Sequence, residues 1–140
     1  MKMKSMAVGW LVAGAFALNA ADMKVEVSKL PPAAGKKDVT FDKDIKPLFE
    51  AACYKCHGPE VEKPKGKFRA DTRASVVKTT EDGPNVTPGD VSKSPLLAMI
   101  AWVAEDEEMY MPPKDNKAKI PQMTKEQVGL VRAWIEQGAK

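Results

Sequence analysis

The sequence predicts a helix-rich domain with a loop-rich middle, on three observations. Apolar residues recur at spacings of three and four over 41–52, and the apolar segment 95–103 follows Ser94 and begins with proline. The segment 124–137 opens with Thr124 and Gln127 in the spacing of a capping box and stops at Gly138. Between the first two segments, 58–90 holds too many prolines and glycines for one long element.

The first helix runs directly into Cys53. Pro47 is tolerated in a first turn but not in a helix interior, so Asp44 is expected to be the N-cap. Inside the loop-rich middle, a short helix is expected after Thr72. The 95–103 helix is apolar almost all round, which indicates burial on more than one side.

Cys53, Cys56 and His57 form a C-x-x-C-H motif from the two cysteines and the single histidine of the chain. Three such residues scattered at random would take this spacing in about 1 of 10,000 arrangements. On a helical turn, residues i, i+3 and i+4 share one face, so all three side chains can meet one flat ligand. The motif therefore predicts one covalently attached haem c, with two thioethers and His57 as the proximal iron ligand.

Other uses of the motif fit less well. Zinc normally takes four ligands, and here only carboxylates could be added to two cysteines and one histidine. A redox dithiol normally lies between a strand and a helix of a βαβ unit, and the sequence shows no such pattern. In a host that does not attach haem, the two cysteines could close a disulfide instead.

Residues 1–21 have the pattern of a secretory signal peptide. Lys2 and Lys4 precede an apolar run over 6–18, and cleavage is expected after Ala20 or Ala21. The run is short for a membrane span, so an uncleaved anchor is the weaker alternative. A periplasmic or otherwise exported protein without an integral membrane span is therefore expected.

The rest of the chain divides into a linker or tail at 22–38, rich in turn-forming residues, and a single monohaem domain at 39–140. Without Lys2 and Lys4 it has 20 basic and 19 acidic residues, a net charge of +1. This balance does not indicate binding to nucleic acid or to an anionic membrane surface. The expected partners are redox proteins that dock transiently.

The second axial position cannot be filled by another histidine of the same chain. Methionine is the usual alternative, and it raises the haem potential. Met99 and Met123 lie in or beside apolar helices, where packing explains them. The candidates beyond the signal peptide are Met23, Met99, Met109, Met111 and Met123.

Met111 is the favoured candidate among these methionines. In an extended stretch Met109 and Met111 face the same side, so direction does not separate them. Pro112 biases the Met111 backbone toward the extended region, and Pro113 stiffens the segment. Met109 and an open or weakly occupied position stay as alternatives.

Six blocks of sequence carry a family resemblance when taken together. They are Phe41-Asp42-Lys43-Asp44-Ile45-Lys46-Pro47, Cys53-x-x-Cys56-His57-Gly58-Pro59, Phe68-Arg69-x-Asp71-Thr72-Arg73, Pro88-Gly89-Asp90 with Ser94-Pro95-Leu96, Met111-Pro112-Pro113, and Trp134-Ile135-x-x-Gly138-Ala139. With these blocks, residues 39–139 resemble a class I c-type cytochrome, and more narrowly the planctomycete-type cytochrome c domain.

The resemblance implies an all-α cytochrome c fold whose N- and C-terminal helices cross beside a covalently attached haem. In this chain the crossing would pair Ile45 and Phe49 with Leu130 and Trp134. The resemblance also implies His57 and Met111 as the axial ligands.

Two arginines of the third block have two possible roles. Arg69 and Arg73 could bind the haem propionates, because a guanidinium forms paired hydrogen bonds with a carboxylate. Asp71 lies between them and could instead hold both in a structural ion pair, which is the favoured interpretation.

The expected function is single-electron transfer by a haem whose two axial positions are filled, so no enzymatic activity is expected. Lys55, Lys63, Lys65 and Lys67 are candidate docking charges, although ordinary solvated surface is the favoured interpretation. One alternative is a haem enzyme or gas-binding protein with a labile sixth ligand, for which Arg69, Arg73 or Glu108 would have to act at the distal side. Another is a fixed haem subunit of a larger oxidoreductase.

Overall fold

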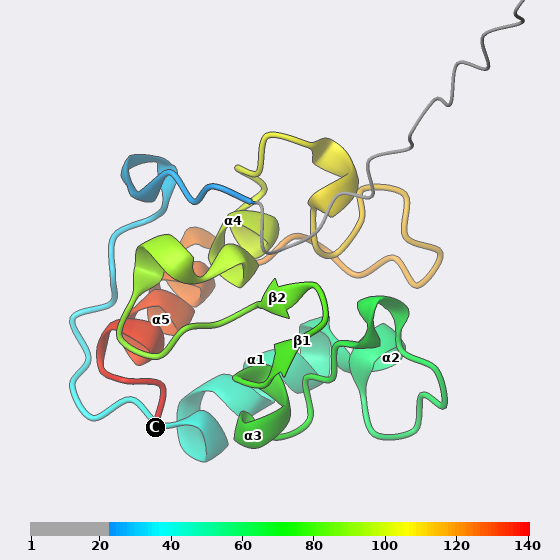
Figure 1. Cartoon of the computed structure of the whole chain (residues 1–140), viewed down its shortest axis with the longest axis horizontal. Coiled ribbons are helices and arrows are strands. Elements are labelled where there is room, and N and C mark those ends of the chain that lie inside the picture. Colours follow the sequence, from blue (N-terminus) through cyan, green and yellow to red (C-terminus); the bar gives the residue numbers. More distant parts are fainter. Residues whose placement is uncertain (1–22) are drawn as a thin grey trace, which may run out of the picture.

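The computed structural model describes residues 23–140, and the expected signal peptide lies outside the described residues. The α-helices are short apart from the last one (Figure 1). Within 23–140, no helix is long and apolar enough to cross a membrane. The α-helices and strands are α1 (Lys46–Ala52), α2 (Tyr54–His57), α3 (Arg73–Val76), β1 (Thr79–Thr80), β2 (Gly83–Pro84), α4 (Pro95–Ala101) and α5 (Lys125–Glu136). The short non-α turns are η2 (Val27–Lys29), η3 (Phe41–Ile45), η4 (Lys65–Lys67), η5 (Val91–Lys93) and η6 (Glu107–Met109).

The fold is helix-rich, as expected, but it is not purely helical. In the loop-rich middle, β1 and β2 pair antiparallel, with Thr79 opposite Pro84 and Thr80 opposite Gly83. The Thr80 hydroxyl donates a hydrogen bond to the Gly83 carbonyl at 2.9 Å, which closes the turn between the strands. The all-α expectation is wrong in this detail, because such a short hairpin has no alternating pattern by which to recognise it.

The first helix begins earlier than predicted, with the π-helical turn η3. The Lys46 N–H bonds to the Phe41 carbonyl, and α1 continues with Pro47 in its first turn. Asp44 is not the N-cap of α1. Its side chain reaches back to accept the Thr40 N–H at 2.9 Å, which satisfies a donor ahead of the helical segment.

Three other helix predictions are confirmed. Thr72 caps α3, Pro95 opens α4, and Thr124 with Gln127 forms a capping box at the start of α5. α4 ends at Ala101 instead of 103, because Trp102 takes the left-handed conformation there.

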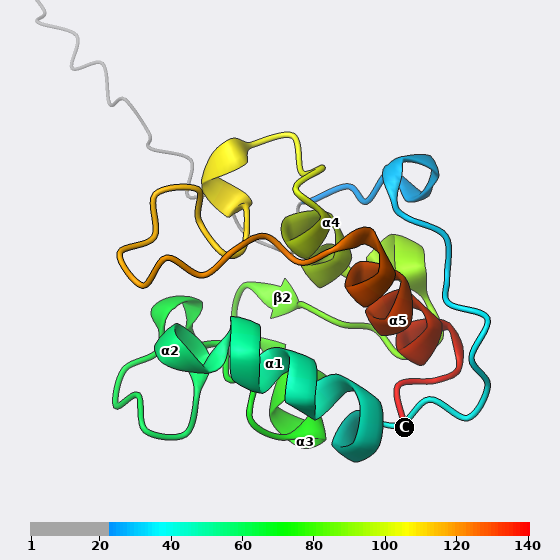
Figure 2. The ribbon, with the colours of Figure 1, turned by 180° about the vertical axis from the view of Figure 1, so that it is seen from behind.

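The core lies where the η3 turn meets α5. The Phe41 ring is 5.7 Å from the Trp134 ring and 6.1 Å from the Phe49 ring, and all three residues are buried. The first and last helical segments therefore do pack together, chiefly through Phe41. α4 packs on α5 as well, and Figure 2 shows α1, α4 and α5 gathered around this core.

Residues 23–38 do not form a loose tail. In Figures 1 and 2 this segment (blue to cyan) runs along the outside of α5. Val25 and Leu30 are buried in the core, and the Ala34 N–H donates to the Gly129 carbonyl at 2.9 Å. Arg132 donates to the Pro31 carbonyl at 3.0 Å. The sequence of the expected linker or tail does not indicate this packing, since its anchors on α5 lie about a hundred residues away.

Candidate haem-binding site

The C-x-x-C-H motif forms one turn of helix, as its spacing predicts. The N–H groups of Cys56 and His57 both donate to the Cys53 carbonyl, at 3.1 and 2.8 Å. Cys53 is half-buried and Cys56 is exposed, and both are free thiols. The two sulfurs and the imidazole are therefore carried by a single rigid turn.

Gly58 ends this turn where no side chain would fit. A Cβ at this position would lie 2.5 Å from the Tyr54 carbonyl oxygen. The loop that follows Gly58 returns to the motif, where the Ala70 N–H donates to the His57 carbonyl at 2.9 Å.

The returning loop orients the His57 ring. Its Nδ1 lies 3.0 Å from the Phe68 carbonyl oxygen, and because that oxygen can only accept, Nδ1 carries the proton. The unprotonated Nε2 is then the atom available to a metal. The Phe68 ring packs edge-on against the imidazole, with centroids 5.4 Å apart.

Burial acts on both kinds of ligand in the motif. It lowers the pKa of His57, which favours the neutral imidazole that a metal requires, although the Phe68 hydrogen bond acts in the opposite direction. Burial raises the pKa of Cys53 to about 12, so this sulfur is not a ready thiolate. Among residues 23–140, no group of three or more histidine, cysteine, aspartate or glutamate side chains could hold a metal ion. The raised pKa of Cys53 does not favour the redox-dithiol alternative, which needs a thiolate.

Two apolar cavities meet at the motif, of about 240 and 50 Å³. Cys53, His57, Ile100 and Met111 line both of them. The remaining apolar walls come mainly from α4 and from the segments around Met111 and Met123, so residues far apart in the chain enclose one space. The further apolar lining is Phe68, Leu96, Met99 and Met109 in the larger cavity, and Ala52, Pro112, Pro113, Ile120 and Met123 in the smaller one.

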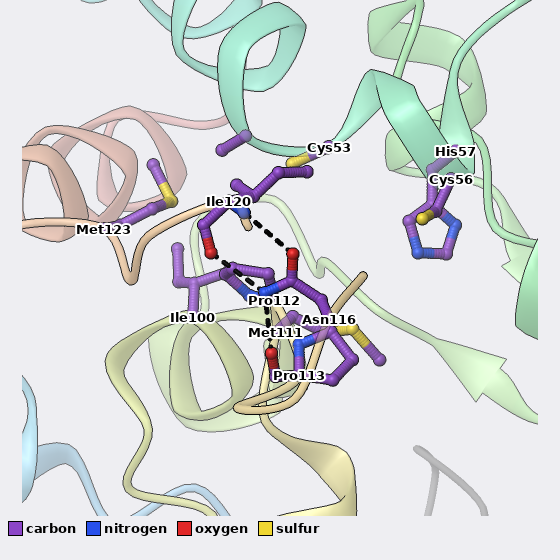
Figure 3. Close-up of a pocket in the computed structure, with 11 residues that line it drawn as sticks. Cys53, Cys56, His57, Ile100, Met111, Pro112, Pro113, Asn116, Ile120 and Met123 are labelled. Carbon is purple, nitrogen blue, oxygen red and sulfur yellow. Dashed lines mark hydrogen bonds between the residues drawn. The ribbon is translucent and has the colours of Figure 1, made fainter. Parts of the chain in front are cut away.

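Met111 and His57 approach this space from different elements. In Figure 3 the Met111 side chain extends from its loop toward the side on which the His57 ring lies, whereas Met123 lies on the opposite side of the view. Met109 also lines the larger cavity, but of the two only Met111 borders both. The arrangement supports Met111 over Met109 as the second axial ligand.

These residues fit haem c. Two thiols and one imidazole stand on the same helical turn, the imidazole nitrogen left free is Nε2, and a methionine lines the same apolar space. A flat apolar group held there would be shielded from water by the side chains of α4 and the Met111 loop.

Both arginines donate hydrogen bonds to backbone carbonyls. The Arg69 guanidinium donates to the carbonyls of Gly58 and Val61, at 3.0 and 2.8 Å, and so closes the loop that follows the motif. Arg73 donates to the Ala139 carbonyl and ties α3 to the C-terminal end. The Asp71 Oδ1 is buried without a hydrogen-bond partner, and no ion pair joins Asp71 to either arginine.

Most of the residues that line the two cavities lie in a part of the chain that matches a known protein family. Residues 53–115 match the family model of planctomycete cytochrome C. This match confirms, over 53–115, the resemblance indicated by the sequence motifs. No curated protein and no solved structure gives a significant match.

Several site residues escaped the sequence patterns. The Phe68 carbonyl orients His57 from 11 positions away. The Asn116 side chain bonds to Pro113 and to both backbone groups of Ile120, and so shapes the loop beside the smaller cavity. Asparagine in a proline-rich turn is the one local signal that could have indicated this role.

Proposed function

We propose that this protein is an exported monohaem c-type cytochrome that passes single electrons between redox partners. The observation that carries the proposal is that Cys53 of the attachment motif, His57 and Met111 line both apolar cavities beside the motif. Haem c supplies the Fe(III)/Fe(II) couple when bound. The chain attaches it through Cys53 and Cys56, and His57 and Met111 hold the two axial positions.

Filled axial positions leave no coordination site for a substrate, which favours a carrier over an enzyme. The side chains considered for distal catalysis are placed elsewhere, since Arg69, Arg73 and Glu108 line neither cavity. Arg69 and Arg73 are instead bonded to backbone carbonyls. The placement of these side chains therefore gives the enzyme alternative no support.

The surface beside the motif supports transient docking. Lys55, Lys63, Lys65 and Lys67 are exposed, and Lys65 also lines the mouth of the larger cavity. Lys67 pairs with Glu81 at 3.0 Å, with both side chains largely in solvent. Exposed charges of this kind change association rates more than affinity, which suits a carrier that must also dissociate.

The axial assignment is tested by absorption spectroscopy of the purified holoprotein. The oxidised wild type is expected to show a low-spin spectrum with the far-red sulfur-to-iron band, and its reduced form is expected not to bind carbon monoxide. Met111→Ala should lose the band and bind carbon monoxide, since its sixth position opens.

Met109→Ala is the matched control, because it removes the neighbouring methionine from the same cavity. It should keep the band and stay inert to carbon monoxide. A wild type that binds carbon monoxide would contradict the carrier function, whereas loss of the band in Met109→Ala alone would move the ligand to Met109.

A further inference from the structure

Both backbone hydrogen-bonding groups of Met111 are tied to the end of α4. The Met111 N–H donates to the Met99 carbonyl at 3.1 Å, and the Met111 carbonyl accepts from the Trp102 indole Nε1 at 3.2 Å. The residue that is proposed to bind the iron is therefore held by a helix end and not only by its own loop.

Trp102 occupies a position at which glycine is normally found. It follows α4 with φ 58° and ψ 42°, in the left-handed region. The Trp102 N–H bonds to the Met99 carbonyl at 3.2 Å and the Val103 N–H to the Ala98 carbonyl at 3.0 Å, which is the pattern of a Schellman cap. A bulky residue is a genuine outlier in this conformation, so its side chain must contribute something that glycine lacks.

The face of the Trp102 indole ring is also packed against another aromatic ring. Trp102 and Tyr110 stack with an interplanar angle of 7° and centroids 5.5 Å apart. The Lys114 ammonium lies 5.2 Å from the Tyr110 centroid and 5.9 Å from the Trp102 centroid, and it pairs with Glu107 at 2.7 Å. Residues on both sides of Met111 are thus held against the same indole.

We propose that Trp102 is a positioning residue for Met111, which acts through its indole N–H and its stack on Tyr110 to hold the methionine sulfur at the iron. The inference rests on the proposed His57/Met111 ligation. Its consequence is that Trp102 determines the fraction of molecules in which Met111 has left the iron. It therefore also determines how weakly an added ligand competes with Met111 for the iron.

Imidazole added to the oxidised holoprotein measures this property, because it can bind only in the fraction of molecules from which Met111 has withdrawn. The apparent affinity is proportional to that fraction. Trp102→Asn removes the ring while keeping a residue that tolerates the left-handed region. The apparent imidazole affinity is expected to rise about tenfold, equivalent to about 1.4 kcal/mol, with a weakened far-red band and a lower reduction potential. Trp102→Phe keeps a ring for stacking but lacks the indole N–H. Its apparent imidazole affinity should lie between those of the wild type and Trp102→Asn.

Lys119→Asn is the matched control. Lys119 has φ 54°, is exposed, and lies, like Trp102, between α4 and α5. The variant therefore introduces asparagine at a left-handed position without touching the stack. It should bind imidazole like the wild type. Urea unfolding of all variants shows whether a substitution only destabilises the whole fold. General destabilisation would lower the urea midpoint without raising imidazole affinity under native conditions.

Unchanged imidazole affinity in both Trp102 variants, with the wild-type band intact, would overturn the positioning role and leave the proposed ligation standing. If Trp102→Asn does not fold, Trp102→Phe decides the matter by the same measurement. A wild type without the band, or one whose band survives Met111→Ala, would overturn the ligation and this inference with it.

Discussion

Asp44 shows how a single carboxylate can hold the η3 turn to the segment that precedes it. Its side chain is only 7% exposed, and it accepts hydrogen bonds from the Lys36 ammonium and from the Thr40 N–H. The Lys36 bond first, and the Thr40 bond second, lower the pKa of Asp44 from its ordinary value of 3.8. The ionised form is thus stabilised by contacts that exist only in the folded protein.

The pH dependence follows from this lowered pKa. Above 3.8 the carboxylate is ionised in both states, and the folded state gains the full benefit of its hydrogen bonds. As the pH falls below that value the unfolded chain takes up the proton first, so this stabilisation is lost through the folded pKa. Asp44→Asn should therefore lower the urea midpoint at neutral pH, and the difference from the wild type should shrink in acid.

Asp42→Asn is the comparison for this measurement. Asp42 is exposed, lies on the same π-helical turn, and makes no side-chain hydrogen bond within the described part of the chain. Its variant should follow the wild-type curve. An Asp44→Asn difference that stayed constant from neutral to strongly acid pH would show that the loss is one of packing and not of charge.

At the scale of the elements, α5 depends on a close approach by the segment that precedes the first helix. Gly129 lies on the face of α5 where this segment crosses, and a Cβ built there would meet the Pro32 carbonyl oxygen at 2.6 Å. The Ala34 N–H bonds to the Gly129 carbonyl beside it. Glycine weakens a helix interior by about 1 kcal/mol relative to alanine, so the packing must require it here.

Gly129→Ala is therefore expected to destabilise the protein in spite of alanine's better helix propensity. The obstacle is a backbone oxygen that cannot rotate away, and overpacking of this kind costs about 1–3 kcal/mol. Urea unfolding measures the loss, and hydrogen exchange of the Ala34 amide should speed up because its acceptor is displaced. Gly35→Ala, where an added Cβ meets nothing within 4 Å, is the control. A Gly129→Ala protein more stable than the wild type would mean that the 23–38 segment can move away from α5 at little cost in free energy.

At the scale of the whole molecule, the two cavities beside the C-x-x-C-H motif are lined by parts of the chain that lie far apart in the sequence. Cys53 and His57 come from the start of the family-matched region, Met111 comes from near its end, and Met123 lies beyond it. A buried apolar plate linking these parts would stabilise the folded state over the unfolded chain. Covalent attachment would keep that plate in place even when the fold opens.

The double variant Cys53→Ala/Cys56→Ala tests this role of attachment. The wild type is expected to keep its haem through a denaturing gel stained for haem, whereas the variant should lose it. The melting temperature of the variant should also fall, by at least about 5 °C. Lys55→Ala, an exposed change between the two cysteines, should retain both properties. Haem that stays with the double variant under denaturing conditions would exclude thioether attachment through the motif.

Patterns within a few residues were enough to predict much of the fold and of the cofactor site. The helical turn of Cys53, Cys56 and His57, the Thr72 cap of α3 and the capping box of α5 are all local contacts, set by neighbours three or four positions apart. The family match then confirmed the resemblance that these and the other blocks indicated. By itself, therefore, the sequence predicted a haem-attachment motif and determined where most of the helices begin.

Only the tertiary structure decided how that chemistry is held. The proton on the His57 Nδ1 depends on the carbonyl of Phe68. The anchoring of Met111 depends on Met99 and Trp102, and the packing of 23–38 depends on the distant helix α5. In each case a backbone group is satisfied by a residue to which no local periodicity points. Such contacts depend on a core around Phe41 and Trp134 that holds the segments together, because the chain must offset the entropy of closing long loops.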